Sequence, residues 1–100
     1  MRVLFANNTL RKCYEQEKMR VKRWGKKIAR RYVERVNILH ASKSAQDLYE
    51  FPHLRFHPLG GDREGEYALD LDRMWRLIVT FADERMIIVR VEEVSDQYGD

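Results

Sequence analysis

The sequence predicts an α+β domain in which an N-terminal strand and a two-helix hairpin pack on a mainly antiparallel sheet of about four strands. Apolar residues recur at helical spacing between residues 10 and 39, and they alternate with polar residues after Pro52. The length of 100 residues and the hydrophobic content of 44% suit one modest core. We therefore expect a single domain over residues 1–100, in the order strand, two helices and three strands.

The N-terminal elements follow from two short patterns. Residues 3–6 form an apolar run with aromatic and β-branched members, which favours a brief buried strand. Asn8 or Thr9 then offers a helix N-cap, because a short side-chain oxygen can accept a backbone N–H that the first turn leaves free. One amphipathic helix is indicated by apolar residues at helical spacing, namely Leu10, Cys13, Tyr14, Val21 and Trp24. Gly25 is expected to interrupt this helix.

A second helix completes the hairpin. Its apolar positions follow the i, i+4 pattern and end near residues 40–42; they are Ile28, Tyr32, Val36 and Leu39. Ser44 and Asp47 have the spacing of a capping box. This spacing predicts a short third helix through Glu50, which Pro52 terminates.

Residues after Pro52 show the alternation that is typical of strands. The alternating segments are residues 54–57, 67–71 and 75–81, and a further apolar strand covers residues 86–91. Short turns between the last three segments favour consecutive antiparallel pairing through hairpins. Both faces of the last two strands are apolar or nearly so. We therefore expect the helical hairpin to cover one face of the sheet. Met74 and Ile78 would then leave an apolar surface for a partner on the other face.

Charge is distributed unevenly along the chain. Residues 11–35 hold eleven basic and three acidic residues, a net charge of +8. Residues 62–100 hold five basic and eleven acidic residues, a net charge of −6. A dense basic stripe attracts polyphosphate through counterion release, so a nucleic-acid or ribonucleoprotein partner is indicated. A solvated helix surface is the simpler alternative.

Composition excludes several classes of protein. Cys13 is the only cysteine and cannot form an internal disulfide, and the apolar stretch at residues 1–6 is too short for a signal peptide or a membrane span. We therefore expect a cytoplasmic protein without a membrane partner. His53 and His57 are four residues apart, but the flanking prolines oppose the helix that would bring them together, so no metal site is expected. Cys13 is expected to be a buried small hydrophobe.

Candidate chemical groups gather around His57. This histidine stands beside Pro58 and a Gly-Gly turn, with Arg63 close behind. Histidine can transfer a proton near neutral pH, and arginine can hold a phosphate through two parallel hydrogen bonds. Taken singly, these residues are better explained as a strand cap and a turn.

Arg76 and the acidic C-terminal segment extend this set. Strand alternation places Arg76 opposite Leu77 and Val79, so it is expected on the open side of the sheet as a phosphate ligand or half of an ion pair. Residues 92–100 add carboxylates and the Tyr98 phenol, which can accept or donate protons.

Four segments of the C-terminal half form a recognisable pattern: RFHPLGGDREG at residues 55–65, YAL at residues 67–69, MWRL at residues 74–77 and EVSDQYG at residues 93–99. Together they resemble the HigB-like toxins of the RelE/ParE superfamily over about the last half of the chain. The resemblance implies a RelE-like fold and the toxin of a type II toxin-antitoxin system. It also implies an endoribonuclease that enters the ribosomal A site and cleaves translated mRNA through 2′-hydroxyl attack, without a metal or other cofactor. A cognate HigA-like, DNA-binding antitoxin would hold it inactive.

The resemblance also implies roles for particular residues. His57 would transfer a proton, Arg76 would stabilise the charged phosphorane, and Asp96 would match the aspartate of the terminal motif. The chain departs from the family at Gly60, where the HPLKG motif has lysine, and at residues 97–98, where the Asp-Tyr-His motif has Tyr-His. Tyr98 is the substitute for the missing histidine. RNA phosphates would be bound by basic residues of the helices and the central motif: Lys22, Arg23, Lys26, Lys27, Arg30 and Arg63.

Two other hypotheses remain open. A non-catalytic member of the same fold would bind its antitoxin as a co-repressor or act on another target such as DNA gyrase, and the two departures favour it. A small basic RNA-binding protein without a toxin role would explain the charge asymmetry. That hypothesis leaves residues 57–63 and residues 75–76 unexplained.

Overall fold

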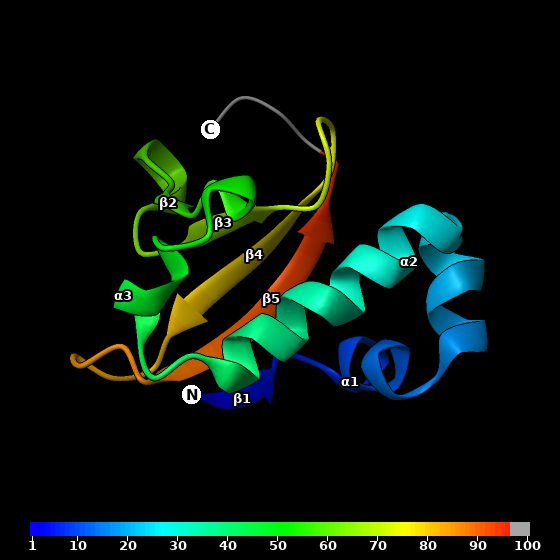
Figure 1. Ribbon diagram of the computed structural model, residues 1–100, viewed down its shortest axis with the longest axis horizontal. Coiled ribbons are helices and arrows are strands. Elements are labelled where there is room, and N and C mark those ends of the chain that lie inside the picture. The colour runs from blue at the N-terminus through cyan, green and yellow to red at the C-terminus, as the bar shows by residue number, and fades with distance from the viewer. Residues whose placement is uncertain (97–100) are drawn as a thin grey trace.

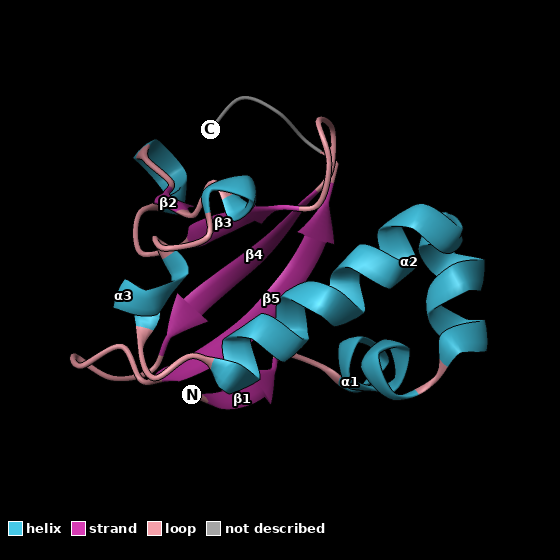
Figure 2. Ribbon diagram, viewed as in Figure 1, coloured by secondary structure: helices cyan, strands magenta, loops and turns pink. Residues whose placement is uncertain are grey.

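The computed structural model describes residues 1–96 and shows a mixed sheet with α2 lying along one face (Figures 1 and 2). In chain order, the elements are β1 (Arg2–Phe5), α1 (Asn8–Glu15), α2 (Glu17–Ala41), α3 (Ala45–Leu48), the 3₁₀ turn η1 (Pro52–Leu54), β2 (His57–Pro58), the 3₁₀ turn η2 (Gly61–Arg63), β3 (Tyr67–Asp70), β4 (Arg76–Phe81) and β5 (Ile88–Ser95). The α+β class is confirmed. Within residues 1–96, no helix has both the length and the apolar composition needed to cross a bilayer.

The sheet of the described residues contains five strands in the order β1-β5-β4-β3-β2. The strands β3, β4 and β5 pair consecutively and antiparallel, as their short connections predict. β1 pairs parallel to β5, with Val3 opposite Val89. A parallel pair needs a long crossover, and the helical segment that follows β1 begins that connection. Two-residue β2 adds the fifth strand, where about four were expected.

The main core lies between α2 and the sheet. α2 contributes Ile28, Tyr32, Val36 and Leu39, which are at most 4% exposed. The strands contribute the residues of one sheet face: Leu69, Leu77, Val79, Val89 and Val91. Residues at helical spacing on α2 and alternate residues of the strands therefore form two apolar surfaces that pack against each other, as the sequence pattern predicts. Burying a large aliphatic side chain of this kind contributes about 1.5–3 kcal/mol.

The helical hairpin differs from the expectation in its details. Asn7, rather than Asn8 or Thr9, is the N-cap of α1, because its Oδ1 accepts a hydrogen bond from the Leu10 amide at 2.9 Å. The helix expected to run to Trp24 is broken at Gln16, which has an extended backbone (φ −127°, ψ 113°). The interruption at Gly25 is confirmed: its φ of +82° lies in the region that favours glycine.

The break at Gln16 is stabilised by a side chain from the following helix. Arg20 Nη1 donates hydrogen bonds to the carbonyl oxygens of Cys13 and Tyr14, at 3.2 and 3.1 Å. These carbonyls lie at the C-terminal end of α1, where carbonyl groups have no amide partner within the helix. A cation at this end also interacts favourably with the helix dipole.

Several expectations for the C-terminal half are corrected. Residues 54–57 do not form the expected strand. Leu54 belongs to η1, the C-cap residue Arg55 has a left-handed backbone (φ 46°, ψ 45°), and only His57 enters a strand, β2. β5 runs to Ser95 rather than ending at Val91. The register with β4 shifts between Val91 and Glu93, so Val94 lies opposite Leu77 and packs on the main core. α3 ends at Leu48 rather than continuing through Glu50. Asp47 Oδ2 accepts a hydrogen bond from the amide of Lys43, whereas a capping box would use the amide of Ser44.

The second face of the sheet is less open than the sequence predicts. Ile78 is 1% exposed and packs with Leu59 and Ala68 in a small separate cluster. Leu59 covers this face because the segment from β2 to η2 folds back along β3, where the Leu59 amide bonds to the Glu66 carbonyl. Met74 is 57% exposed, as expected. Ile78 is therefore a core residue and offers no surface to a partner.

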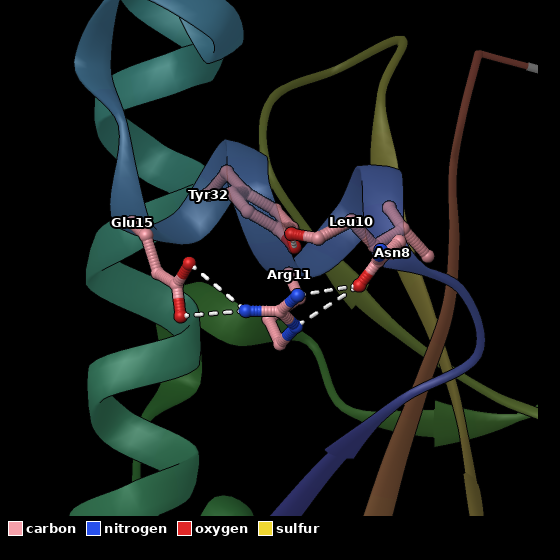
Figure 3. Close-up of polar contacts among 5 residues, drawn as sticks. All are labelled: Asn8, Leu10, Arg11, Glu15 and Tyr32. Atoms are coloured by element: carbon pink, nitrogen blue, oxygen red, sulfur yellow. Dashed lines mark hydrogen bonds and ion pairs between the residues drawn. The ribbon is translucent and has the colours of Figure 1, made fainter.

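α1 is attached to α2 by a buried polar contact. Tyr32 Oη donates to the Leu10 carbonyl at 2.7 Å, and Figure 3 shows the Tyr32 ring directed at α1. On the exposed side of α1, Arg11 contacts Asn8 and Glu15 (Figure 3). Cys13 is buried, as predicted, and burial raises the pKa of its thiol. Burial is also the largest cause that raises the pKa of Tyr32.

We predict that Tyr32→Phe lowers the free energy of unfolding by about 1–3 kcal/mol, because it leaves the Leu10 carbonyl without its buried donor. Urea denaturation followed by circular dichroism measures the change. Tyr49→Phe is the matched control, since Tyr49 is 53% exposed and its change should stay within about 0.5 kcal/mol. Equal effects of the two substitutions would show that the α1–α2 hydrogen bond contributes nothing specific.

Candidate functional site

A groove of about 1430 Å³ lies where α2, η1 and the β3–β4 turn meet. Its described lining holds six basic and three acidic residues, which gives it a net positive charge. The basic members are Lys27, Arg31, Arg35, Arg55, Arg73 and Arg76, and the acidic members are Glu34, Asp70 and Asp72. His53, His57, Leu71, Met74 and Trp75 complete the lining. A groove with a surplus of positive charge can attract an anionic ligand.

Two arginines of α2 form the wall of the groove nearest the main core. Arg31 Nη1 donates to the Leu71 carbonyl at 2.7 Å, and Arg35 Nε donates to the Asp70 carbonyl at 3.0 Å. The two side chains lie one helical turn apart and therefore reach consecutive carbonyls at the end of β3. Burial lowers the pKa of Arg35, and the neighbouring Glu34 partly offsets this effect.

Asp72 shapes the turn between β3 and β4. Its Oδ1 accepts hydrogen bonds from the amides of Met74 and Trp75, at 2.8 and 2.7 Å, and its Oδ2 lies 3.2 Å from Lys27 Nζ. Burial opposes ionisation of this carboxyl group, but the two amides and Lys27 together lower its pKa. The ionised carboxylate thus holds the turn that leads into Arg76.

The opposite wall carries His57. This residue lies opposite Ala68 in the β2–β3 register, while Arg76 lies opposite Asp70 in the β3–β4 register. Strand alternation therefore places His57 and Arg76 on the same face of the sheet, and both line the groove. His57 Nδ1 lies 2.6 Å from the Arg55 carbonyl oxygen.

The structure brings together part of the set of residues expected to act in catalysis. Arg76 is on the predicted face, but it is only 8% exposed and so belongs to the floor of the groove rather than to an open sheet surface. Asp96 is exposed and follows Ser95, the register partner of Arg76. Tyr98 and Gln97 lie outside the described residues. The role of each residue in catalysis stays a prediction.

The predicted phosphate ligands fall into two groups. Those on α2 are exposed: Lys22, Arg23, Lys26, Lys27 and Arg30. Lys27 also lines the groove, so this basic face of α2 continues into it. Arg63 lies instead on η2, where it pairs with Glu66 at 2.6 Å and with Glu93. Hydrogen bonds to these carboxylates raise the pKa of Arg63.

Sequence reasoning missed several groove residues. Arg31 and Arg35 entered the sequence analysis only through the net charge of residues 11–35, although their spacing of four places them on one helix face. Arg55 and Asp70 form an ion pair of 3.6 Å between two separate segments, and no local pattern indicates it. Within residues 1–96, no cluster of three or more His, Cys, Asp or Glu side chains is arranged to hold a metal ion.

Comparison with known proteins agrees with this architecture. A family model described as the RelE-like toxin of the type II toxin-antitoxin system HigB matches residues 3–93. No curated protein matches the chain. Among solved structures, YafQ from E. coli strain BL21(DE3) is similar with a TM-score of 0.66 and 16% identity, over 97% of this chain and 94% of that chain.

Two further structures share the fold. The YoeB/ParE toxin from Agrobacterium tumefaciens has a TM-score of 0.58 and 18% identity, over 98% of this chain and 100% of that chain. The YoeB-YefM complex from Staphylococcus aureus has a TM-score of 0.59 and 17% identity, over 98% of each chain. At these identities the likeness concerns the fold.

We predict that Asp72→Ala lowers the free energy of unfolding by about 1–3 kcal/mol at pH 7, because two turn amides lose their acceptor. The lowered pKa means that the stabilisation is complete above the ordinary value of 3.8 and disappears as the pH falls through the folded-state value. Urea unfolding at pH 7 and in steps below pH 4 measures this, with Asp62→Ala, at an exposed position, as the control. A gap between wild type and variant that persists in acid would contradict this role of the carboxylate.

Proposed function

Because the chain belongs to the HigB-like family of RelE-like toxins from type II toxin-antitoxin systems, we propose that it is an endoribonuclease that cleaves messenger RNA on the ribosome. The observation that carries this proposal is the presence of His57 and Arg76 on one face of a cationic groove. The groove continues into an exposed basic helix face through Lys27. RNA phosphates can follow this positive surface without being read by sequence.

The proposed reaction is a transesterification. The 2′-oxygen of the RNA forms a bond to its own phosphorus, and the bond from phosphorus to the 5′-oxygen of the next nucleotide breaks. One side chain takes the proton of the 2′-hydroxyl, and another gives a proton to the leaving oxygen. His57 is the group in the groove best suited to one of these transfers, since imidazole is the side chain that most often transfers protons in enzymes. Asp96 and Tyr98 are proposed to carry out the other proton transfer.

Arg76 is proposed to stabilise the negative charge that develops on the phosphorane. A guanidinium presents two parallel N–H donors to phosphate oxygens. Because Arg76 is only 8% exposed, its charge acts in a region from which much of the water is excluded, and there it has a larger effect than at the surface. Gly60 leaves its position in the family motif without the usual lysine, so the groove arginines are proposed to supply that charge.

The basic face of α2 is proposed to bind ribosomal RNA. Its five lysines and arginines, at residues 22–30, are exposed. Arg30 lies 3.8 Å from Glu34 in an exposed ion pair, which is weak, so Arg30 can exchange Glu34 for a phosphate. Lys27 lies 3.2 Å from Asp72 at the edge of the groove. Docking through backbone phosphates would position the groove on the message while leaving sequence choice to the ribosome.

We also propose that a cognate antitoxin binds this chain. The family description assigns these toxins to toxin-antitoxin pairs, and the similar S. aureus structure is a YoeB-YefM complex. A HigA-like, DNA-binding antitoxin is the proposed partner. Met74, 57% exposed at the groove, is an apolar side chain that such a partner would cover.

We predict that His57→Ala lowers the rate of mRNA cleavage by about 10²- to 10⁴-fold, the usual contribution of a proton-transfer group. Mapping of 5′ ends in a translation reaction measures the cleavage. Arg76→Lys should lower it as well, since it keeps a positive charge but loses the paired donors. His53→Ala is the matched control, because this exposed histidine lines the same groove and should leave the rate nearly unchanged.

Intact messages in the presence of the folded wild-type chain would contradict the nuclease proposal. Growth arrest on expression without any message cuts would move the target away from mRNA and favour the non-catalytic or gyrase-directed alternative. Absence of growth arrest would favour a binding protein without a toxic activity.

We predict that Lys26→Glu together with Arg30→Glu weakens association with purified ribosomes and flattens its dependence on salt by about one unit of slope per lost phosphate contact. Sedimentation with ribosomes over a series of salt concentrations measures this. Lys43→Glu with Arg85→Glu makes the same change of charge at exposed positions outside the basic face. Equal weakening by both pairs would mean that net charge, rather than the basic face of α2, governs binding.

A further inference from the structure

Arg55 combines an unusual backbone conformation with a place in the groove. Its φ of 46° and ψ of 45° are left-handed, which is uncommon for a residue other than glycine. Arg55 is the C-cap of η1 and lies two positions before His57. Such a conformation costs free energy and persists only where surrounding contacts hold it.

Two contacts hold Arg55 in this conformation. Its amide donates to the Pro52 carbonyl at 3.2 Å, which closes the 3₁₀ turn. Its Nε lies 3.6 Å from Asp70 Oδ2, so the side chain reaches across to the end of β3. The side chain is 77% exposed, and an ion pair of this kind contributes little by itself. The backbone turn is therefore the main constraint.

The left-handed turn directs the Arg55 carbonyl at the His57 ring. The oxygen lies 2.6 Å from Nδ1. A carbonyl oxygen can only accept a hydrogen bond, so Nδ1 must carry the proton. In neutral His57 the lone pair is then on Nε2, the ring atom on the far side from Arg55.

We propose that Arg55 is a positioning residue for His57: its left-handed backbone sets the histidine tautomer so that Nε2 is the atom that exchanges a proton in the groove. This inference rests on the proposed nuclease function for its biological meaning. The tautomer itself is a property of the isolated chain and can be measured without RNA.

The test compares substitutions that allow or forbid the left-handed turn. Arg55→Gly keeps the turn accessible and removes the guanidinium. Arg55→Pro locks φ near −65° and excludes the turn. Arg55→Val disfavours the same conformation without removing the amide hydrogen. The ¹⁵N chemical shifts of the His57 ring, in the whole chain labelled at histidine and held at alkaline pH, report the tautomer of the neutral ring.

The wild type and Arg55→Gly are expected to show protonated Nδ1 and unprotonated Nε2, whereas Arg55→Pro and Arg55→Val are expected to lose this preference. Amide spectra show whether each variant is folded, and the valine variant decides the matter if the proline variant does not fold. A wild type protonated at Nε2, a folded valine or proline variant with the wild-type tautomer, or loss of the tautomer in Arg55→Gly would each overturn the proposal.

Cleavage assays separate this inference from the proposed function. If the chain cleaves mRNA, Arg55→Pro should lower the rate about 10²-fold, as expected when a reacting group is misplaced, and Arg55→Gly should lower it much less. Equal losses in the two variants would assign the effect to the guanidinium and overturn the positioning role. A wild type that leaves mRNA intact would refute the nuclease, while the ring shifts would still decide whether Arg55 sets the tautomer.

Discussion

The hydrogen bonds from Arg31 and Arg35 to the carbonyls of Leu71 and Asp70 join the helix layer to the end of the sheet. They reach the point where β3 stops and the turn to β4 begins, so the direction of the turn depends on α2. Leaving the Arg35 guanidinium 6% exposed without such a partner would be costly, because a buried charge needs compensation. This attachment forms one wall of the groove, beside the turn that Asp72 holds ahead of Arg76.

The charges of the groove are arranged so that many cations can lie close together. Each acidic residue of the described lining lies near a basic one: Asp72 near Lys27, Asp70 near Arg55, and Glu34 near Arg35. These pairs reduce the repulsion among the six basic side chains, and the described lining keeps a net positive charge. A phosphate that enters such a groove can replace a carboxylate partner rather than meet bare, mutually repelling cations. The proposed phosphate site is therefore compatible with a stable fold.

The periodic parts of the fold were predictable, and the departures have local causes. Tyr32 and Val36 were placed in the core from their spacing, and the hairpins of β3, β4 and β5 followed from alternation. The break at Gln16 was not visible, because the apolar spacing of α1 continues into α2, and the Arg20 contact that accompanies the break depends on how the two helices pack. Ile78 was assigned to a partner surface because alternation shows which face a residue is on but not what covers that face. The segment after β2 supplies that cover through Leu59.

The amino-acid sequence by itself determined the class of fold, the basic helix face and the candidate pair His57 and Arg76, because helical and strand periods and a contiguous motif are local properties. Tertiary structure alone decided that the segments 27–35, 53–57 and 70–76 each contribute side chains to one groove. It also decided that Arg76 is buried there, that Arg63 pairs with carboxylates elsewhere, and that Arg55 turns its carbonyl to His57. The physical reason is that these relations join segments far apart in the chain through packing and register, which no spacing along a single segment encodes.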